Sequence, residues 1–275
     1  MTTAVLIPAR VTPGLALRAL NAAAALWLGA AAIGQALFLF YILRFYGPSV
    51  ATGNFQLWRL NKMLIKGYVP GDTAGNLAFA GHVTMAAVIT FGGVVQLTPQ
   101  IRARFPAVHR WTGRAFMVTA MGASLAGLYM TWARHTGGPI GTTAISLDAL
   151  LILAFSSLAW RKALHRDFAS HRKWAMRAFL VANGVWFLRV GFAPFALIAK
   201  GLGREDLIGP FFIAWNFGSY LVPLAVLELY FRAKERGSPA GRLAMAGGLT
   251  TLTALMSVGI AGAWIGFFAP ILAKL

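Results

Sequence analysis

The chain has 275 residues, of which 58% are hydrophobic and only 12% are charged, and its mean hydropathy of +0.67 lies outside the range of ordinary soluble domains. Its formal charge of +18 would suggest a nucleic-acid partner for a soluble chain, but the basic residues fall between apolar runs, where they orient membrane helices and meet anionic lipid headgroups. The complete absence of cysteine excludes disulfides, thiolate metal sites and iron–sulfur clusters. We therefore predict a polytopic membrane protein that does not bind nucleic acid.

The first apolar run covers residues 22–43 and follows Arg10 and Arg18. This run is too long for the core of a signal peptide, so we predict an uncleaved first membrane span.

The segment 54–66 follows the first span and has an amphipathic pattern. Its leucines share one helical face, and its basic residues Arg59, Lys62 and Lys66 share another. This pattern predicts either an interfacial helix lying on the membrane surface or a loop helix packed on the bundle.

Six further spans are predicted from hydropathy, near residues 77–98, 114–133, 143–160, 174–198, 210–231 and 243–270. No connection between them is long enough to hold a soluble domain. We predict an all-α fold: one integral membrane domain over 1–275 with about seven transmembrane helices and one interfacial amphipathic helix. The motifs described below all lie in a core over 77–230.

Basic residues are distributed unequally between the two sides that these spans define. Sixteen fall on the side of the N-terminus and eight on the other, with Arg189 inside a span. The positive-inside rule then predicts a cytoplasmic N-terminus.

Four polar residues, His82, Asp148, Arg189 and Asn216, lie at similar depths in four different predicted spans. At about 1.5 Å per residue they are roughly 8–14 Å below the outer surface. An unpaired charge at such a depth costs at least about 2.5–3.5 kcal/mol, and Asp148 is the one carboxylate that matches Arg189 in depth. We expect these two to pair. The cluster is either an outward-facing binding or proton-transfer site, with His82 as its titratable member, or a structural ion pair.

A second polar cluster lies at the opposite ends of the spans, where a His-Arg pair occurs twice at a helix start. His109 is followed by Arg114, and His171 by Arg177, each about one turn or more further along. Arginines at helix starts suit phosphate or carboxylate groups, and two histidines at one depth could hold haem b iron or contact a quinone. The alternative is that these residues are only positive-inside charges in contact with lipid.

Other chemical motifs are missing. The sequence has no Gly-rich phosphate loop, no HExxH, no CxxC and no Ser-His-Asp grouping, so we predict no metal site and no specific hydrolase or kinase activity. Two-haem membrane cytochromes usually place both ligands on one helix about 13 residues apart, and no span here carries two histidines in that way.

The succession of Gly81-His82, Gly92, Gln96-Leu97, 109–114 (HRWTGR), 171–177 (HRKWAMR) and Leu188-Arg189 resembles a bacterial family of predicted membrane proteins of unknown function. The resemblance covers residues 77–230 and implies that these positions form one unit in a bacterial inner membrane. The histidine motifs are also distantly similar to those of membrane b-type cytochromes and ferric-reductase-like proteins.

Three functional hypotheses follow from these patterns. The first is a redox-linked membrane protein that binds haem or a quinone through His109 and His171, with Arg114 and Arg177 neutralising propionates or phosphates. The second is a proton-coupled transporter of a small molecule that uses His82, Asp148 and Arg189. The third is a non-catalytic subunit or lipid-binding scaffold. The sequence does not decide whether the protein is an enzyme.

Overall fold

The computed structural model describes residues 12–61, 67–136 and 138–275, and these ranges form helices and no strands. The apolar helices and the segments that continue them are α1 (Pro13–Tyr41), η1 (Ile42–Tyr46), α2 (Gly47–Thr52), α3 (Thr73–Leu97), α5 (Pro106–Arg134), α6 (Gly138–Leu164), α8 (Gly184–Gly201), α9 (Ile208–Arg236), α10 (Pro239–Ala263), η4 (Trp264–Phe268) and α11 (Ala269–Leu272). The other elements are η2 (Phe55–Leu60), α4 (Pro99–Arg104), α7 (Phe168–Ala182) and η3 (Glu205–Leu207). Within the described residues, seven helical segments are long and apolar enough to cross a membrane, which confirms the predicted all-α bundle of seven spans.

Several helices begin at a side chain that accepts a hydrogen bond from the first turn. Thr12 accepts from the backbone N–H of Leu15 at the start of α1, and Ser238 accepts from that of Gly241 at the start of α10. Both caps are followed directly by proline, whose fixed φ and missing N–H suit the first helical position. These caps explain why the helices extend beyond the apolar runs that hydropathy detects.

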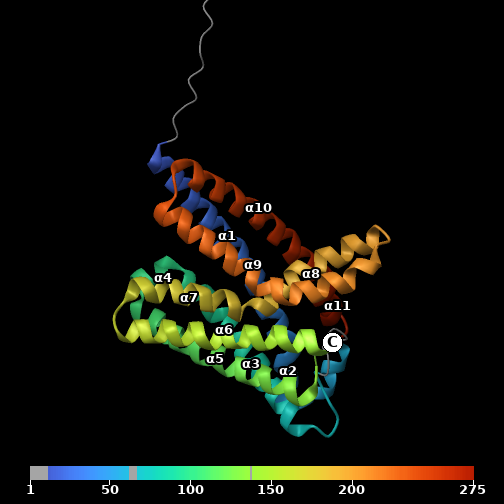
Figure 1. The fold of residues 1–275 in the computed structure, drawn as a ribbon. Helices are drawn as coiled ribbons and strands as arrows, with labels where there is room; N and C mark the ends of the chain where they lie inside the picture. The colour runs from blue at the N-terminus through green and yellow to red at the C-terminus, as the bar shows by residue number, and fades with distance from the viewer. Residues whose placement is uncertain (1–11, 62–66, 137) are drawn as a thin grey trace, which may run out of the picture.

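The helices form two layers that lie at an angle to each other (Figure 1). In one layer α3, α5, α6 and α7 pack side by side, and in the other α1 packs against α10, with α8 and α9 joined to them. The two layers meet where α1 contacts α3 and where α9 contacts α6 and α7. Helices that are distant in sequence, such as α1 and α10, are therefore direct neighbours.

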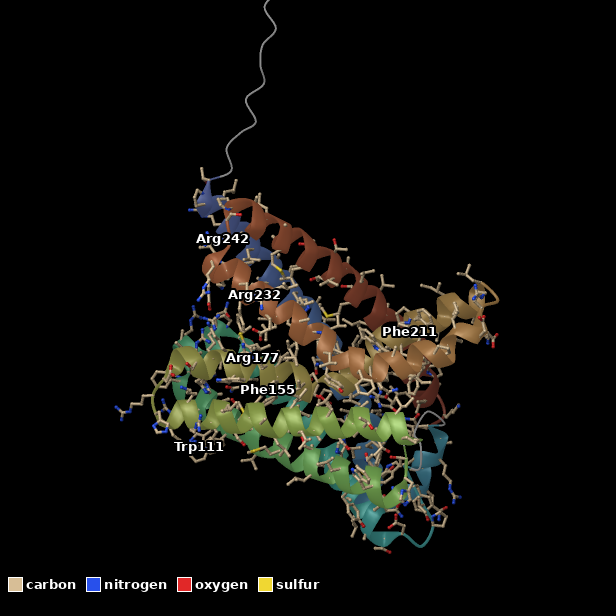
Figure 2. All side chains as sticks on the ribbon, viewed as in Figure 1. Trp111, Phe155, Arg177, Phe211, Arg232 and Arg242 are labelled. Carbon is tan, nitrogen blue, oxygen red and sulfur yellow. The ribbon has the colours of Figure 1, made fainter. Side chains whose placement is uncertain are left out.

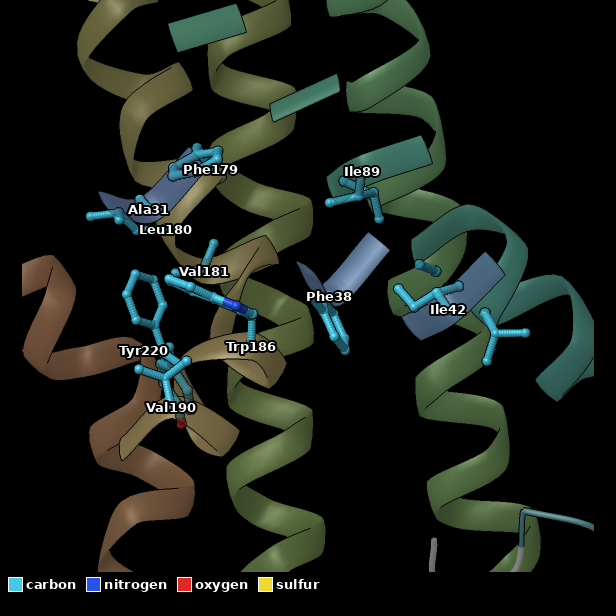
Figure 3. Close-up of a cluster of buried hydrophobic side chains, with 14 of the residues drawn as sticks. Ala31, Phe38, Ile42, Ile89, Phe179, Leu180, Val181, Trp186, Val190 and Tyr220 are labelled. Atoms are coloured by element: carbon cyan, nitrogen blue, oxygen red, sulfur yellow. The ribbon is translucent and has the colours of Figure 1, made fainter. Parts of the chain in front are cut away.

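Small residues allow close approach within the second layer. A Cβ built on Gly34 of α1 would lie 2.6 Å from both Ile260 and Trp186, and one built on Gly259 of α10 would clash with the backbone carbonyl of Val190. Trp186 is 1% exposed and belongs to a core in which Phe38 occupies the centre, with Trp186 and Tyr220 on one side and Ile89 on the other (Figure 3). Close packing of this kind is the main source of helix association in a membrane.

The predicted span 174–198 differs from the structure, because the chain leaves the helical conformation at Asn183, between α7 and α8. The Asn183 side chain donates a hydrogen bond to the carbonyl of Phe179 at 2.8 Å, and the next residue is Gly184. Asparagine competes with the backbone for hydrogen bonds and glycine is a poor helix former. The predicted single span is therefore two helices, α7 and α8, that meet at Asn183.

The predicted helix 54–66 overlaps a short 3-10 helix, η2. Trp58 in this element is 1% exposed, with its ring centroid 4.5 Å from that of Phe55 and 4.8 Å from that of Phe79. The described part of the segment is therefore packed on the bundle, and its place relative to a membrane surface stays a prediction. Residues 62–66 lie outside the described residues.

A buried arginine attaches the start of α3 to the end of α5. Arg134 is 6% exposed and donates to the Asp72 carboxylate at 2.8 Å, to the Asn76 side-chain oxygen at 2.8 Å and to the carbonyl of Gly67 at 3.2 Å. The backbone N–H of Gly75 and the Arg134 guanidinium both hold the pKa of Asp72 below its usual value. Arg134 therefore has a structural role as the last residue of α5.

Candidate functional site

A cavity of about 110 Å³ lies inside the bundle, where the two layers meet. Its wall combines α1, α3, α5 and α6 with the turn between α7 and α8. Most of the wall is apolar, and its polar members are His82, Thr90, Ser124, Asp148 and Asn183. Thr90 and Ser124 donate their hydroxyl hydrogens to carbonyls of their own helices. The polar groups that could bind a ligand in the cavity are therefore those of His82, Asp148 and Asn183.

His82 is held in α3 by a contact with α5. Its Nδ1 lies 2.9 Å from the carbonyl oxygen of Ala123, and because a carbonyl can only accept, Nδ1 carries the hydrogen. In the neutral ring Nε2 is then the acceptor, able to take a proton or a hydrogen bond from a group in the cavity. This arrangement fixes both the tautomer and the direction of the ring.

Asp148 of α6 lies against the break between α7 and α8. A Cβ built on Gly184 would lie 3.1 Å from Oδ2 of Asp148, so the absence of a side chain at Gly184 leaves room for the carboxyl group. Gly184 is also the first residue of α8, whose N-terminus favours a nearby negative charge. The other oxygen, Oδ1, is buried and has no hydrogen-bond partner among the described residues. A buried carboxyl oxygen without a partner is unusual and costly in a folded protein.

Asn183 connects the cavity to α1. Its Oδ1 accepts a hydrogen bond of 2.9 Å from the side-chain nitrogen of Gln35, and the two residues are 3% and 2% exposed. Oε1 of Gln35 is itself buried without a partner in the described structure. This hydrogen bond between two side chains joins the turn between α7 and α8 to α1.

Arg189 does not form the predicted pair with Asp148. It donates to the carbonyl of Val185 at 2.8 Å and lies 5.5 Å from the centroid of the Phe38 ring, and no ion pair joins it to a carboxylate in the described ranges. The prediction was wrong because it rested on depth along a continuous helix, whereas the helix ends at Asn183 and Arg189 of α8 contacts Val185 and Phe38 instead. Val185 and Phe38 both line the cavity, so Arg189 lies directly behind its wall.

Asn216 also lies apart from the cavity. It is on α9, which contributes none of the residues of the cavity wall, and its side-chain nitrogen donates to the carbonyl of Phe212 in the same helix at 2.7 Å. Of the four residues grouped by depth, the structure brings His82 and Asp148 into one cavity, places Arg189 behind its wall and leaves Asn216 outside.

The second cluster lies at what we call the basic end of the bundle, where α5 and α7 begin and α6 ends. His171 has its Nδ1 2.9 Å from the carbonyl oxygen of Ala159, which leaves Nε2 as the acceptor. Nδ1 of His109 is buried without a hydrogen-bond partner among the described residues, and the two histidines are close enough for their charges to interact. The structure therefore brings both histidines to the same end of the bundle.

The two arginines of this cluster have different surroundings. Arg177 makes two hydrogen bonds with the Glu228 carboxylate, at 2.7 and 2.9 Å, and lies 4.6 Å from the ring centroid of Trp174. Figure 2 shows Arg177 between α7 and α9. Arg114 is exposed and lies 4.8 Å from the ring centroid of Trp111, which is 68% exposed. Arg177 is therefore already bound by a carboxylate, whereas Arg114 faces the surroundings of the bundle.

Residues 79–231, more than half of the chain, match the family described as "Predicted membrane protein (DUF2306)". The chain belongs to this family. It is an integral membrane protein, and the function of the DUF2306 family is unknown. No curated protein and no solved structure matches the chain.

The part of the chain that matches the DUF2306 model runs from α3 to α9. It contains His82, Asp148 and Asn183 of the cavity together with His109 and His171 of the basic end. Phe38, which lines the cavity from α1, and Gln35, which bonds to Asn183 of the cavity wall, lie before the matched range.

Three residues at or beside the site were not identified in the sequence analysis. Gln35 is a lone amide in an otherwise apolar stretch of the first span, and Asn183-Gly184 is a turn-forming dipeptide within a predicted span. Both signals were present in the sequence. The hydrogen bond between Gln35 and Asn183 could not be read from it, because it joins residues 148 positions apart.

Proposed function

We propose that this DUF2306 protein is a proton-coupled membrane carrier of a small polar solute, with the cavity around His82 and Asp148 as its binding site. The observation that carries this proposal is the buried Oδ1 of Asp148, which has no partner among the described residues and belongs to a cavity lined by an imidazole with Nε2 available. A solute or water that bonds to both groups would remove the cost of the unpartnered oxygen.

The two groups are complementary as acid and base. A neutral carboxyl group of Asp148 can donate a hydrogen bond, and Nε2 of His82 can accept one. Transfer of a proton would leave a carboxylate near the start of α8, where the helix dipole stabilises negative charge. Ionisable groups inside membrane bundles commonly mark proton or substrate pathways.

The size of the cavity restricts the solute. A volume of about 110 Å³ corresponds to roughly three to four water molecules at about 30 Å³ each. We therefore expect a solute of a few heavy atoms with at least one hydrogen-bond donor and one acceptor. The place of the cavity between the two helix layers means that a movement of one layer against the other would alter access to it.

The test is a pH jump on liposomes that contain the purified full-length protein, adsorbed on a solid-supported membrane. The wild-type protein should displace charge when the pH falls from about 8 to about 6, because a proton that enters the cavity moves across part of the membrane. Asp148→Asn should abolish the displacement, and His82→Gln should change its pH dependence. Glu205→Gln removes an exposed carboxylate and serves as the control. An unchanged response in Asp148→Asn would contradict the proposal.

Solute coupling is measured on the same membranes by concentration jumps of glycine and of formate and acetate, whose neutral acids carry both a donor and an acceptor. A current that one of these solutes drives, and that Asp148→Asn removes, would identify the chemical class of the solute.

A second candidate function is redox-linked and rests on the basic end. The Ala159 carbonyl contacts Nδ1 of His171 and leaves its Nε2 available. Nδ1 of His109 is buried without a partner in the described structure. Such nitrogen atoms are expected in side chains that hold a haem iron or bond to a quinone carbonyl. Its test is the visible absorption spectrum of the purified protein, oxidised and then reduced. A Soret band that is lost in both His109→Ala and His171→Ala would support haem binding, and a colourless protein after expression with a haem precursor would contradict it.

A further inference from the structure

A groove of about 400 Å³ runs along the outside of α5 and α6, towards the basic end of the bundle. It is open rather than enclosed. It is lined by Val118 and Met121 of α5 and by Ser157, Trp160, Arg161 and Leu164 of α6. Its walls are mainly apolar, and the cationic group among them is a single arginine.

The register of the two helices shows which other residues lie at the same level. Nε1 of Trp132 donates to Oγ of Ser146 at 3.2 Å, and Oγ of Ser157 lies 4.0 Å from Sδ of Met121. Both contacts fit one antiparallel register, in which residue 161 is level with residue 117 and residue 114 with residue 164. Arg114 and Arg161 are therefore separated by about three residues along the helix axes, or about 4.5 Å.

Arg114 lies on the groove side of α5. Residues 111, 114, 118 and 121 are spaced by three or four positions and so share one helical face, and two of them, Val118 and Met121, line the groove. Arg114 lies over the exposed ring of Trp111, which Figure 2 shows on the outside of the bundle at this end. Arg114 and Arg161 are both exposed, so two guanidinium groups flank one end of an apolar groove.

We propose that this groove binds one anionic phospholipid. The phosphate lies between Arg114 and Arg161, which can each donate two parallel hydrogen bonds to it, and an acyl chain lies along Val118 and Met121. Trp111 is placed at the headgroup level, where amphipathic rings concentrate, whereas Trp160 is level with Val118 and lies beside the acyl chain. The groove is complementary to a negative headgroup because the chain has only seven acidic residues against 25 basic ones, and the groove wall contains no carboxylate in the described structure.

Native mass spectrometry of the purified full-length protein, incubated with equal amounts of dioleoyl phosphatidylglycerol and dioleoyl phosphatidylcholine, tests this proposal. The wild-type protein should retain one phosphatidylglycerol in preference to phosphatidylcholine. The double variant Arg114→Gln, Arg161→Gln should reduce that preference at least about tenfold, because each guanidinium contributes charge-assisted hydrogen bonds to the phosphate.

The matched control is the double variant Arg232→Gln, Arg236→Gln, which removes the same charge from exposed positions at the end of α9. It should keep the preference of the wild-type protein. Equal retention of the two lipids by the wild-type protein would overturn the proposal. An equal loss of preference in both double variants would also overturn it, because net charge rather than the groove would then select the lipid.

Discussion

The hydrogen bond between Gln35 and Asn183 should contribute measurably to the free energy of unfolding. Replacement of Gln35 by methionine keeps the length of the side chain and removes the donor, which leaves Oδ1 of Asn183 buried and unpaired. An orphaned buried acceptor costs roughly 1–3 kcal/mol. The same change removes Oε1 of Gln35, which already has no partner in the described structure, and this gain offsets part of the cost. We expect Gln35→Met to destabilise the protein by about 1 kcal/mol.

A double-mutant cycle isolates the bond itself. Asn183→Ala should cost more than Gln35→Met, because it also removes the bond to the Phe179 carbonyl. Hydrogen bonds between membrane helices average about 0.6 kcal/mol and reach about 1.7 kcal/mol. The double variant should therefore be more stable than the sum of the single variants predicts, by about that amount.

The assay is unfolding in mixed micelles at increasing dodecyl sulfate, followed by tryptophan fluorescence. Trp186 is a suitable probe because it is buried and its backbone N–H bonds to the Asn183 carbonyl at 2.9 Å. Thr143→Ala is the control partner, since its hydroxyl bonds only within its own helix, to the carbonyl of Pro139. A coupling energy below about 0.3 kcal/mol, the range of independent sites, would refute the reasoning.

Two further predictions concern packing and pH. Gly259→Ala should destabilise the protein by about 1–3 kcal/mol through overpacking against Val190, whereas Gly247→Ala, with open space at its Cβ, should not; unfolding in the same mixed micelles would contradict this if both behaved alike. The Asp167 side chain accepts bonds from the hydroxyl and N–H of Ser170 and from Lys162, and its pKa is lowered to about 2. A depressed pKa stabilises the folded state above the unfolded value near 4, and that stabilisation is lost as the pH falls towards 2. The melting temperature of the wild-type protein should therefore decrease more steeply between about pH 4 and pH 2 than that of Asp167→Asn, and parallel curves would show that the carboxylate contributes nothing.

Much of the architecture followed from the sequence because membrane spans are long and apolar, so hydropathy detects them without knowledge of their neighbours. Depth along each span was also sufficient to group His82 with Asp148, which line one cavity. Depth along a span does not say in which direction around the helix axis a side chain points. That is why Asn216 was grouped with His82 and Asp148, although it lies outside their cavity. The role of Arg134 could not be predicted for another reason, because its partners Asp72 and Asn76 are about 60 positions away in the sequence.

The predicted pairing of Arg189 shows how one local feature can change a site. The predicted pair rested on the similar depth of Asp148 and Arg189 along two continuous helices. The Asn183-Gly184 pair interrupts the second of these helices, and the backbone at Gly184 takes the position facing the carboxyl group. Asn and Gly in sequence within an apolar run are therefore as informative about a membrane site as the charged residues beside them.

The packing of α1 against α10 also has a consequence for how the protein is made. Spans enter the membrane in the order of their synthesis, so α1 is inserted first among the described spans and α10 last. Before α10 is inserted, the face of α1 around Ala23 and Gly34 has contacts with α8 and α9 but lacks those with Leu249 and Ile260 of α10. A ribosome-bound intermediate that stops before Pro239 should therefore leave part of this face exposed to lipid, and the second layer should become fully protease-resistant only when the final span is released.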